Sequence, residues 1–243
     1  MIHTEKIKLI AFDLDGTLTQ HKTPLSGENR DILFKLKEKY SLLMAGAGSC
    51  ERIFLQMNRF PIDIIGNYGM QYARFNEKSG CIETVKDEKC PCDRESVDER
   101  VTYLRKKFGF TEFKGDNTEF HDSGCVTIPI LGTAADINDK LAFDPDRKKR
   151  RAIYSFVKEL FPEYTVFVGG SSSFDMAPAP FDKAYALGEY TKENGILHCE
   201  AVYIGDDYGE GGNDESVYKS DFNFIKIDNY RDFPDIIKRN GLL

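Results

Sequence analysis

Segments that alternate between strand-like and helix-like character occupy both ends of this 243-residue chain and constrain its fold most. Near the N-terminus, short apolar runs at residues 6–12, 41–45 and 62–65 each end at a polar or glycine-containing turn, and apolar residues at helical spacing follow the first two. The same alternation returns after residue 183. Strands that alternate with helices predict a parallel sheet with helices on its faces. Since both ends share the pattern, we expect one α/β core built from both.

The middle of the chain lacks this regular alternation. Its strand-like segments and its amphipathic helices, predicted at 96–108 and 146–160, follow a looser order that is typical of an α+β arrangement. An insertion of about one hundred residues has the size of an ordinary domain. We therefore expect residues 1–75 and 179–243 to form the two parts of the core, and residues 76–178 to form an inserted α+β domain.

Carboxylates follow two of the predicted core strands, one from each end of the chain. Asp13 and Asp15 come directly after the first apolar run, and Asp206 and Asp207 come directly after the run at 201–204. In open α/β sheets, ligands bind beyond the carboxyl ends of the strands. We therefore expect these carboxylates to meet at one edge of the sheet and to form a site there.

The spacing of Asp13 and Asp15 suits phosphoryl transfer. One carboxylate can attack phosphorus and form an aspartyl-phosphate, and the second can pass a proton to and from the reacting oxygens. Gly16 permits the tight bend that would aim both side chains into one space. An Asp-x-Asp-Gly segment is often only a solvated turn, but the buried strand before it and the distant Gly-Asp-Asp favour a catalytic site.

Two carboxylates that face an anionic phosphate need positive charge beside them. Magnesium suits such a site because it prefers oxygen ligands and is commonly held by few carboxylates together with substrate phosphate. Asp206 is the expected second ligand, and either Asp207 or Asp214 could assist it. Lys183 precedes a predicted helix and could neutralise the nucleophile or the transferred group.

Charge and cysteine usage limit the partners. The formal net charge of −7 argues against a general attraction to nucleic acid or to an anionic membrane. The sequence shows neither an apolar run of membrane-spanning length nor a signal-peptide layout, so we expect a cytoplasmic protein with a small-molecule substrate. Cys90 and Cys92 are the closest of six cysteines and lack further zinc ligands at matched spacing, which predicts reduced thiols.

The motifs together resemble the haloacid dehalogenase (HAD) superfamily of phosphotransferases, in the branch with a large cap domain. FDLDGT (12–17), Lys183 and Gly205-Asp206-Asp207 occur in that family's order. More narrowly, the chain is similar to eukaryotic-type phosphomannomutase over nearly its whole length. The segments that carry this similarity are FDLDGTLT (12–19), GNYGMQY (66–72), TEF (118–120), GCVTIPILG (124–132), GGSSSFDMAPAPFDK (169–183) and IGDDYGEGGNDESV (204–217).

The resemblance implies an HAD-like parallel-sheet core with an inserted cap, and it assigns roles to individual residues. Asp13 would be the nucleophile and Asp15 the general acid and base. Magnesium would be held by Asp13, by the backbone carbonyl of Asp15 and by Asp206. Ser173 and Asp175 would contact sugar hydroxyls. The resemblance also implies a homodimer formed through the cap.

The chain departs from the family pattern at its phosphate-binding positions. The family has a hydroxyl after the second strand, whereas this turn reads Ala-Gly-Ala-Gly-Ser, so the hydroxyl is missing or has moved to Ser49. Where the family holds the distal phosphate with cap arginines, this chain has His121, Thr133 and Lys140, and Lys22 replaces a further arginine of the core. Lysine lacks the bidentate fork of arginine, and threonine lacks charge.

These departures decide which function we expect first. A mutase must hold one phosphate while it transfers the other, whereas a phosphatase needs only one. We therefore expect a magnesium-dependent phosphatase that acts on a small phosphorylated metabolite, such as a sugar phosphate. The alternative is phosphomannomutase activity, which interconverts mannose 6-phosphate and mannose 1-phosphate. A catalytically silent binding module, or a receiver-like domain phosphorylated on Asp13, is a further alternative.

Overall fold

The computed structural model describes residues 4–243, and the chain divides into two compact units. The first unit contains the residues before Glu88 together with Asp182–Gly209 and Asp214–Leu243. The second contains Glu88–Phe181 and the short return segment Glu210–Asn213. The chain thus leaves the first unit and re-enters it, as expected for an insertion.

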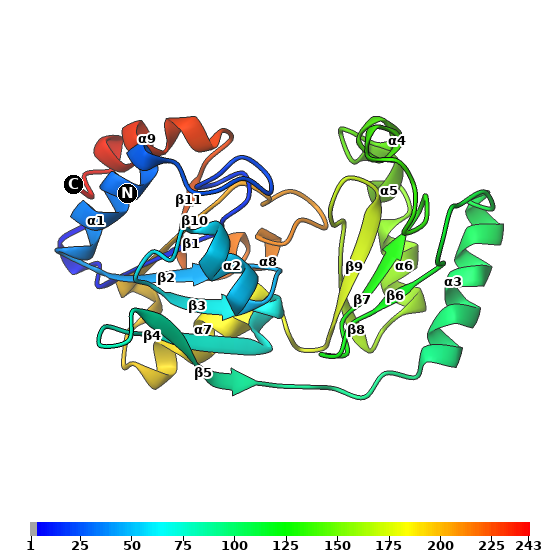
Figure 1. Cartoon of the computed structure of the whole chain (residues 1–243), viewed down its shortest axis with the longest axis horizontal. Coiled ribbons are helices and arrows are strands. Elements are labelled where there is room, and N and C mark those ends of the chain that lie inside the picture. The colour runs from blue at the N-terminus through cyan, green and yellow to red at the C-terminus, as the bar shows by residue number, and fades with distance from the viewer. Residues whose placement is uncertain (1–3) are drawn as a thin grey trace. The chain divides into compact units, whose positions relative to one another are not determined.

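The first unit is built on a seven-stranded sheet with the order β11-β10-β1-β2-β3-β4-β5 (Figure 1). The five strands from β11 to β3 are parallel, and β4 and β5 are antiparallel. Central strand β1 pairs with β2 on one side and with β10 on the other, which confirms a sheet built from both ends of the chain. The strands are β1 (Leu9–Phe12), β2 (Ser41–Ala45), β3 (Asp63–Gly66), β4 (Gln71–Asn76), β5 (Cys81–Asp87), β10 (Ala201–Gly205) and β11 (Asn223–Lys226).

Helices cover both faces of this sheet. α1 (Gly27–Lys37), α2 (Cys50–Gln56) and α9 (Phe233–Arg239) pack on one face, while α7 (Lys183–Glu193) and α8 (Glu215–Tyr218) pack on the other. Since β1 is covered on both sides, all four of its residues are apolar and buried. No helix between residues 4 and 243 has both the length and the apolarity needed to cross a bilayer.

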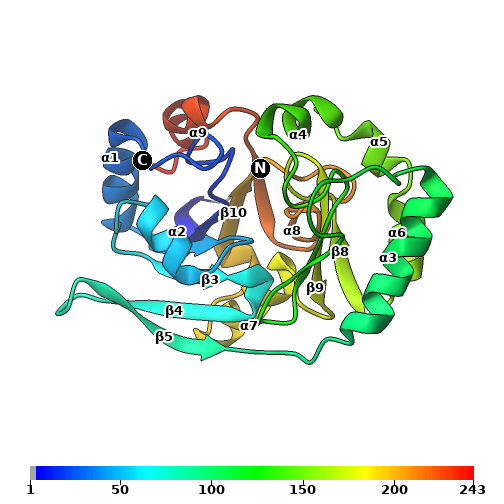
Figure 2. The same ribbon diagram turned by 45° about the vertical axis from the view of Figure 1, so that its right-hand side comes forward.

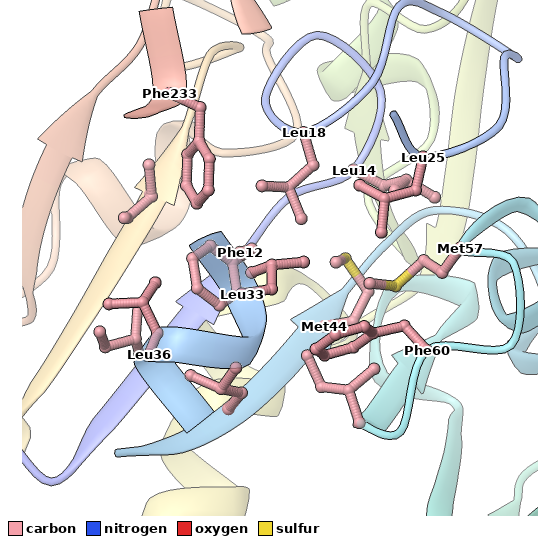
Figure 3. Packing of buried hydrophobic residues seen from close by; sticks show 14 of the residues in the cluster. Phe12, Leu14, Leu18, Leu25, Leu33, Leu36, Met44, Met57, Phe60 and Phe233 are labelled. Carbon is pink, nitrogen blue, oxygen red and sulfur yellow. The ribbon is translucent and has the colours of Figure 1, made fainter. Parts of the chain in front are cut away.

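The core beneath α1, α2 and α9 holds the end of β1 in place (Figure 3). Phe12, the last residue of β1, meets the ring of Phe233 edge-on, with centroids 5.9 Å apart. Leu33, Met44 and Met57 belong to the same buried cluster. The residue that follows Phe12 therefore leaves a closely packed strand at a defined point, which matters for Asp13.

The β4–β5 hairpin continues this sheet and shifts the boundary expected from sequence (Figure 2). β4 pairs antiparallel with β3 and with β5, so residues 76–87 lie in the first unit although they were expected in the inserted domain. Pairing along a whole strand outweighs the local change in sequence character near residue 75. At the other end, the units divide after Phe181 rather than after residue 178.

The second unit has an antiparallel sheet with the order β6-β7-β9-β8. The apolar side chains of α3 and α6 pack against inward residues such as Phe174 and Met176 of β9. Alternate residues of the same strands, including Thr127 and Asp175, point to the opposite face. The elements are α3 (Arg94–Phe108), β6 (Glu119–Phe120), β7 (Val126–Pro129), α4 (Ile137–Phe143), α5 (Lys148–Arg151), α6 (Tyr154–Leu160), β8 (Tyr164–Phe167) and β9 (Ser173–Pro178).

Several elements of this unit differ from the sequence-based expectation. The single helix expected at 146–160 is two helices, because Ile153 has a non-helical backbone (φ −113°, ψ 3°) between α5 and α6. The strands β8 and β9 and the helix α4 were not predicted. The segment around β9 is rich in Gly, Ser and Pro, which is typical of a loop, and becomes a strand because β7 and β8 pair with it on both sides.

Candidate active site

Three carboxylates meet beyond the carboxyl ends of β1 and β10. Asp13 directly follows β1, Asp206 directly follows β10, and Asp214 immediately precedes α8. Each offers a carboxylate oxygen, and these oxygens lie within 4.8 Å of one another. The structure thus brings together Asp13 and Asp206, as the strand pattern predicts. Of the two open alternatives, it is Asp214 and not Asp207 that joins them.

The turn after Asp13 fits closely against Asp206. Gly16 has a left-handed backbone (φ +99°), and a Cβ at this position would lie 2.3 Å from Oδ2 of Asp206. Thr17 donates a hydrogen bond from Oγ1 to Oδ1 of Asp206 over 3.0 Å. Any side chain at position 16 would therefore strain the backbone and displace a carboxylate of the site.

Lys183 joins two of the three carboxylates. It begins α7, is 1% exposed, and places Nζ 2.5 Å from Oδ1 of Asp13 and 2.7 Å from Oδ1 of Asp214. Burial by itself would lower the pKa of Lys183, but the two carboxylates outweigh it and raise that pKa above its usual value. Lys183 is therefore an ammonium at neutral pH.

The charges of the cluster favour a bound cation. Burial raises the pKa of Asp13 well above its usual range, although Lys183 opposes the shift. Burial, and after it the charge of Asp214, raise the pKa of Asp206 to about 6. When all three carboxylates are ionised, they face a single ammonium within the cluster. A divalent cation that prefers oxygen ligands would balance this excess negative charge, so the donor set fits a metal ion.

Asp214 is occupied by other donors and is thus the least available ligand of the three. Its Oδ1 accepts hydrogen bonds from Lys183 and from the hydroxyl of Tyr203, each over 2.7 Å. Its Oδ2 accepts from the backbone N–H of Asp207 over 3.0 Å. Asp214 is therefore better suited to orient Lys183 than to hold a metal, and Asp207 contributes through its backbone.

The carboxylate of Asp15 points to α2 and does not join the acidic cluster. Its Oδ1 accepts hydrogen bonds from Nε2 of Gln56 over 2.6 Å and from the backbone N–H of Lys22 over 2.7 Å. Its Oδ2 lies 3.8 Å from Nη1 of Arg52. Only the backbone carbonyl of Asp15 is then left as the metal ligand that the resemblance implies. One carboxylate oxygen of Asp15 thus accepts two hydrogen bonds, and the other lies 3.8 Å from Arg52 and 4.0 Å from Nδ1 of His21.

Two further expected residues, Lys22 and Ser49, have structural contacts beside their proposed phosphate-binding roles, which stay predictions. The side chain of Lys22 is exposed, and its described contribution to the site is its backbone N–H, which holds Asp15. Ser49 is the N-cap of α2, and its Oγ accepts a hydrogen bond from the backbone N–H of Arg52 over 3.3 Å. The hydroxyl after β2 therefore serves the helix.

Sequence reasoning missed Gln56, Arg52 and Tyr203. Arg52 and Gln56 are four residues apart on α2 and thus share one face of a helix that buries Ile53 and Phe54 elsewhere. A polar pair at this spacing, directly after the second strand, was the available signal. Tyr203 gave none, because it reads as an ordinary apolar position of β10.

In the second unit, a small polar network lies on the sheet face away from the helices. Thr127 donates from Oγ1 to Oδ1 of Asp175 over 3.0 Å, and Ser173 donates to the same oxygen over 3.3 Å. Nε2 of His121 lies 3.2 Å from Oγ1 of Thr127. Burial raises the pKa of Asp175, against the effect of both hydroxyls. The network joins three of the expected residues and adds Thr127.

Lys140 and Thr133 are tied to each other and to a neighbouring loop. Nζ of Lys140 donates to the backbone carbonyl of Thr133 over 2.9 Å. Oγ1 of Thr133 accepts from the backbone N–H of Asp116 over 2.8 Å and lies 3.3 Å from its carboxylate. Within residues 4–243 no hydrogen bond joins this pair to the network around Asp175.

The family of the chain follows from a match to a family model. The model of eukaryotic phosphomannomutase matches residues 30–227, which contain Lys183, Asp206 and Asp214. The chain belongs to the eukaryotic phosphomannomutase family. The phosphomannomutase of Saccharomyces cerevisiae is 26% identical over 222 residues, which cover 86% of this chain and 84% of the relative. The phosphomannomutase of Spinacia oleracea is 24% identical over 221 residues and covers 86% of each chain.

Solved structures agree with the fold of this phosphomannomutase-family chain. An IMP-bound IMP-nucleotidase of Plasmodium falciparum superposes with a TM-score of 0.72 at 15% identity, over 98% of this chain and 69% of its own. A phosphatase of the haloalkanoate (HAD) superfamily from Bacteroides thetaiotaomicron gives a TM-score of 0.64 at 17% identity, over 98% and 96%. The fold is thus that of the HAD superfamily, and the family match indicates that this chain is an enzyme of the phosphomannomutase family.

Proposed function

We propose that this chain works as a phosphomannomutase, in which phosphorylated Asp13 gives its phosphoryl group to a hexose phosphate and takes one back from the other position of the resulting hexose bisphosphate. The observation that carries the proposal is the buried Asp13–Lys183–Asp214 arrangement, with Asp206 beside it, in a chain that matches the family over most of its length. This order reverses the one that the sequence favoured. The relatives named above, which the chain covers by 84% and 86%, are phosphomannomutases, and this supports the mutase over the phosphatase.

The side chains of Asp13 and Asp15 suit the two roles that phosphoryl transfer requires. Lys183 occupies Oδ1 of Asp13, so we assign the attack on phosphorus to Oδ2. The new bond joins Oδ2 to phosphorus while the bond from phosphorus to the sugar oxygen breaks. Asp15 gives a proton to that departing oxygen and later takes one from the accepting hydroxyl. Gln56 and the N–H of Lys22 hold Asp15 at one oxygen and leave the other for this exchange.

Magnesium is the metal that we propose for the acidic cluster. Asp13, Asp206 and the carbonyl of Asp15 would hold it, and it would offset the charge of the transferring phosphoryl group. Ser173 and Asp175 are proposed to contact sugar hydroxyls, with His121 and Thr127 in the same network. The division into a core and a cap, the homodimer and the cytoplasmic location stay predictions of the sequence.

Hydrolysis is a second candidate, and the second unit favours it. A mutase has to retain the phosphate that it does not transfer, and Lys140 and Thr133 replace arginines expected for that purpose. Both already make hydrogen bonds within their own segment. If this leaves the distal phosphate weakly held, water would become the final acceptor, and the same aspartyl-phosphate would release inorganic phosphate.

One experiment separates the two functions. Mannose 1-phosphate is incubated with the protein, Mg²⁺ and a small amount of hexose bisphosphate, and phosphorus NMR follows the products. We expect mannose 6-phosphate to form, and Asp13→Asn to be the inactive blank. Inorganic phosphate as the main product would establish the phosphatase instead. If no hexose phosphate in a broad panel is converted, both functions are wrong and the binding module remains.

A further inference from the structure

The loop between β2 and α2 offers no charged side chain to a phosphate. Residues 46–48 are Gly, Ala and Gly, and the hydroxyl of Ser49 caps α2. In the described part of the chain, the backbone N–H groups of Ala47 and Gly48 donate to no other protein group. Any charged group that acts beside this loop must therefore come from another position.

Arg52 reaches this loop from the first turn of α2. Gly48 leaves the necessary space, since a Cβ there would lie 2.2 to 2.6 Å from atoms of the guanidinium group. Nη1 donates to Oε1 of Gln56 over 3.1 Å, and the same Gln56 holds Asp15 through its amide nitrogen. The guanidinium thus lies between the glycine loop and the carboxylate proposed as acid and base.

The ion pair between Arg52 and Asp15 has no direct hydrogen bond. Nη1 of Arg52 is 3.8 Å from Oδ2 of Asp15, beyond hydrogen-bond distance, and Asp15 already accepts two hydrogen bonds at its other oxygen. The Arg52 side chain is 45% exposed. A guanidinium has five N–H donors, and among residues 4–243 one hydrogen bond from this guanidinium is described, to Gln56. The guanidinium thus lies partly exposed, against Gly48 and near the carboxylate of Asp15.

We propose that Arg52 is a substrate-binding residue, which binds oxygens of the transferring phosphoryl group in place of the hydroxyl that this loop lacks. The planar fork of a guanidinium matches two phosphate oxygens at once. Gln56 holds the fork beside the glycine loop, where the described backbone N–H groups of Ala47 and Gly48 could bind further oxygens of the same anion. The inference rests on the proposed phosphoryl transfer but concerns a residue of this chain that the sequence motifs do not include.

Direct binding of inorganic phosphate tests the proposal without turnover. Calorimetry with the Mg²⁺-loaded protein compares wild type with Arg52→Gln and Arg52→Lys. The matched control is Arg59→Gln, which removes the same charge from an exposed residue shortly after α2. We expect Arg52→Gln to weaken phosphate binding about tenfold to a hundredfold, the range for hydrogen bonds to charged groups. Arg52→Lys should recover part of the loss, and Arg59→Gln should bind like wild type.

Kinetics with a hexose phosphate then separate binding from positioning. If Arg52 binds the phosphoryl group, Arg52→Gln raises KM together with the dissociation constant of phosphate. A lower kcat with both constants unchanged would mean that Arg52 acts only on Asp15, and the proposal would be overturned. It would equally be overturned if wild type bound no phosphate, or if Arg52→Gln and Arg59→Gln bound it alike. Thermal unfolding of each variant checks that it is folded.

The outcomes also keep this inference apart from the proposed function. Weaker phosphate binding in Arg52→Gln, without conversion of any hexose phosphate by wild type, would support the phosphate site and reject the proposed function. If turnover is lost in Asp13→Asn but both turnover and phosphate binding are unchanged in Arg52→Gln, the proposed function is supported and the phosphate site at Arg52 is rejected.

Discussion

In the first unit, the polar and charged groups that converge come from distant parts of the chain, whereas in the second unit they come from neighbouring strands. Lys183 reaches Asp13 across 170 positions of sequence, and both are buried. Thr127 and Asp175 face each other on paired strands and keep partial exposure. Packed elements thus hold the first cluster in a single arrangement, while hydroxyl groups that can rotate line the second. Substitutions should therefore abolish reaction in the first and tune affinity in the second.

The largest effect is expected at the nucleophile. Asp13→Asn should lower kcat by at least about a thousandfold, since loss of a nucleophile removes the covalent route. Two effects on stability oppose each other. Burial raises the pKa of Asp13, so Asn removes the cost of a buried negative charge, but it also removes one of the two carboxylates that pair with buried Lys183. We therefore expect a small net change in stability. Turnover and denaturant unfolding of the same preparation measure both effects.

The second unit should lose stability when its buried ion pair is broken. Arg150 and Asp144 are both fully buried, with Nε 2.9 Å from Oδ2, and Arg150 also donates to the carbonyl of Ser173. Arg150→Met leaves Asp144 buried without its partner and should cost about 3 to 5 kcal/mol. Amide hydrogen exchange should show this loss as faster exchange within the second unit than in the first.

Two further variants test whether the unpaired charge of Asp144 causes this loss of stability. Arg150→Met combined with Asp144→Leu should regain much of the stability, because no charge is then left unpaired. The neighbouring Arg151→Met serves as the control, because it removes a half-buried arginine whose hydrogen bond described in residues 4–243 is to the carbonyl of Glu210. Equal exchange in Arg150→Met and Arg151→Met would contradict the importance of the buried pair.

Metal binding should depend on pH through Asp206. Its pKa of about 6 means that the carboxylate is ionised above that pH and protonated below it. A metal ligand must be deprotonated, so protonation of Asp206 should lower the affinity by about tenfold per pH unit below about pH 6. Calorimetric titration of Mg²⁺ over this range measures the dependence. A flat profile, or a profile unchanged in Asp206→Asn, would remove Asp206 from the metal site.

The smallest effect is expected on the polar face of the second unit. Thr127→Val keeps the shape of the side chain and removes the hydrogen bond to Asp175, which should raise KM for a hexose phosphate by about threefold to tenfold and leave kcat nearly unchanged. Thr165→Val on adjacent β8 provides a control outside the network. A large fall in kcat would contradict the expectation that the first unit carries out the reaction while the second unit affects substrate affinity.

The first unit was largely predictable because its signals are local. Buried parallel strands such as β1 and β10 are continuous apolar runs, and the site carboxylates follow them directly. The fold class and the family followed from these segments and their order. In the second unit, the strand β9 could not be predicted, because its pairing with β7 and β8 overrides a composition that is typical of loops.

Within the site, the sequence determined which residue types were available, and the tertiary structure decided what each of them does. Asp13, Lys183 and Asp206 could be named from motifs. The choice of Asp214 over Asp207, the use of Ser49 as a helix cap and the position of Arg52 beside Gly48 could not. Hydrogen-bond partners of a side chain depend on distances of a few ångströms between elements far apart in the chain. Those distances exist only after the sheet and its helices have packed.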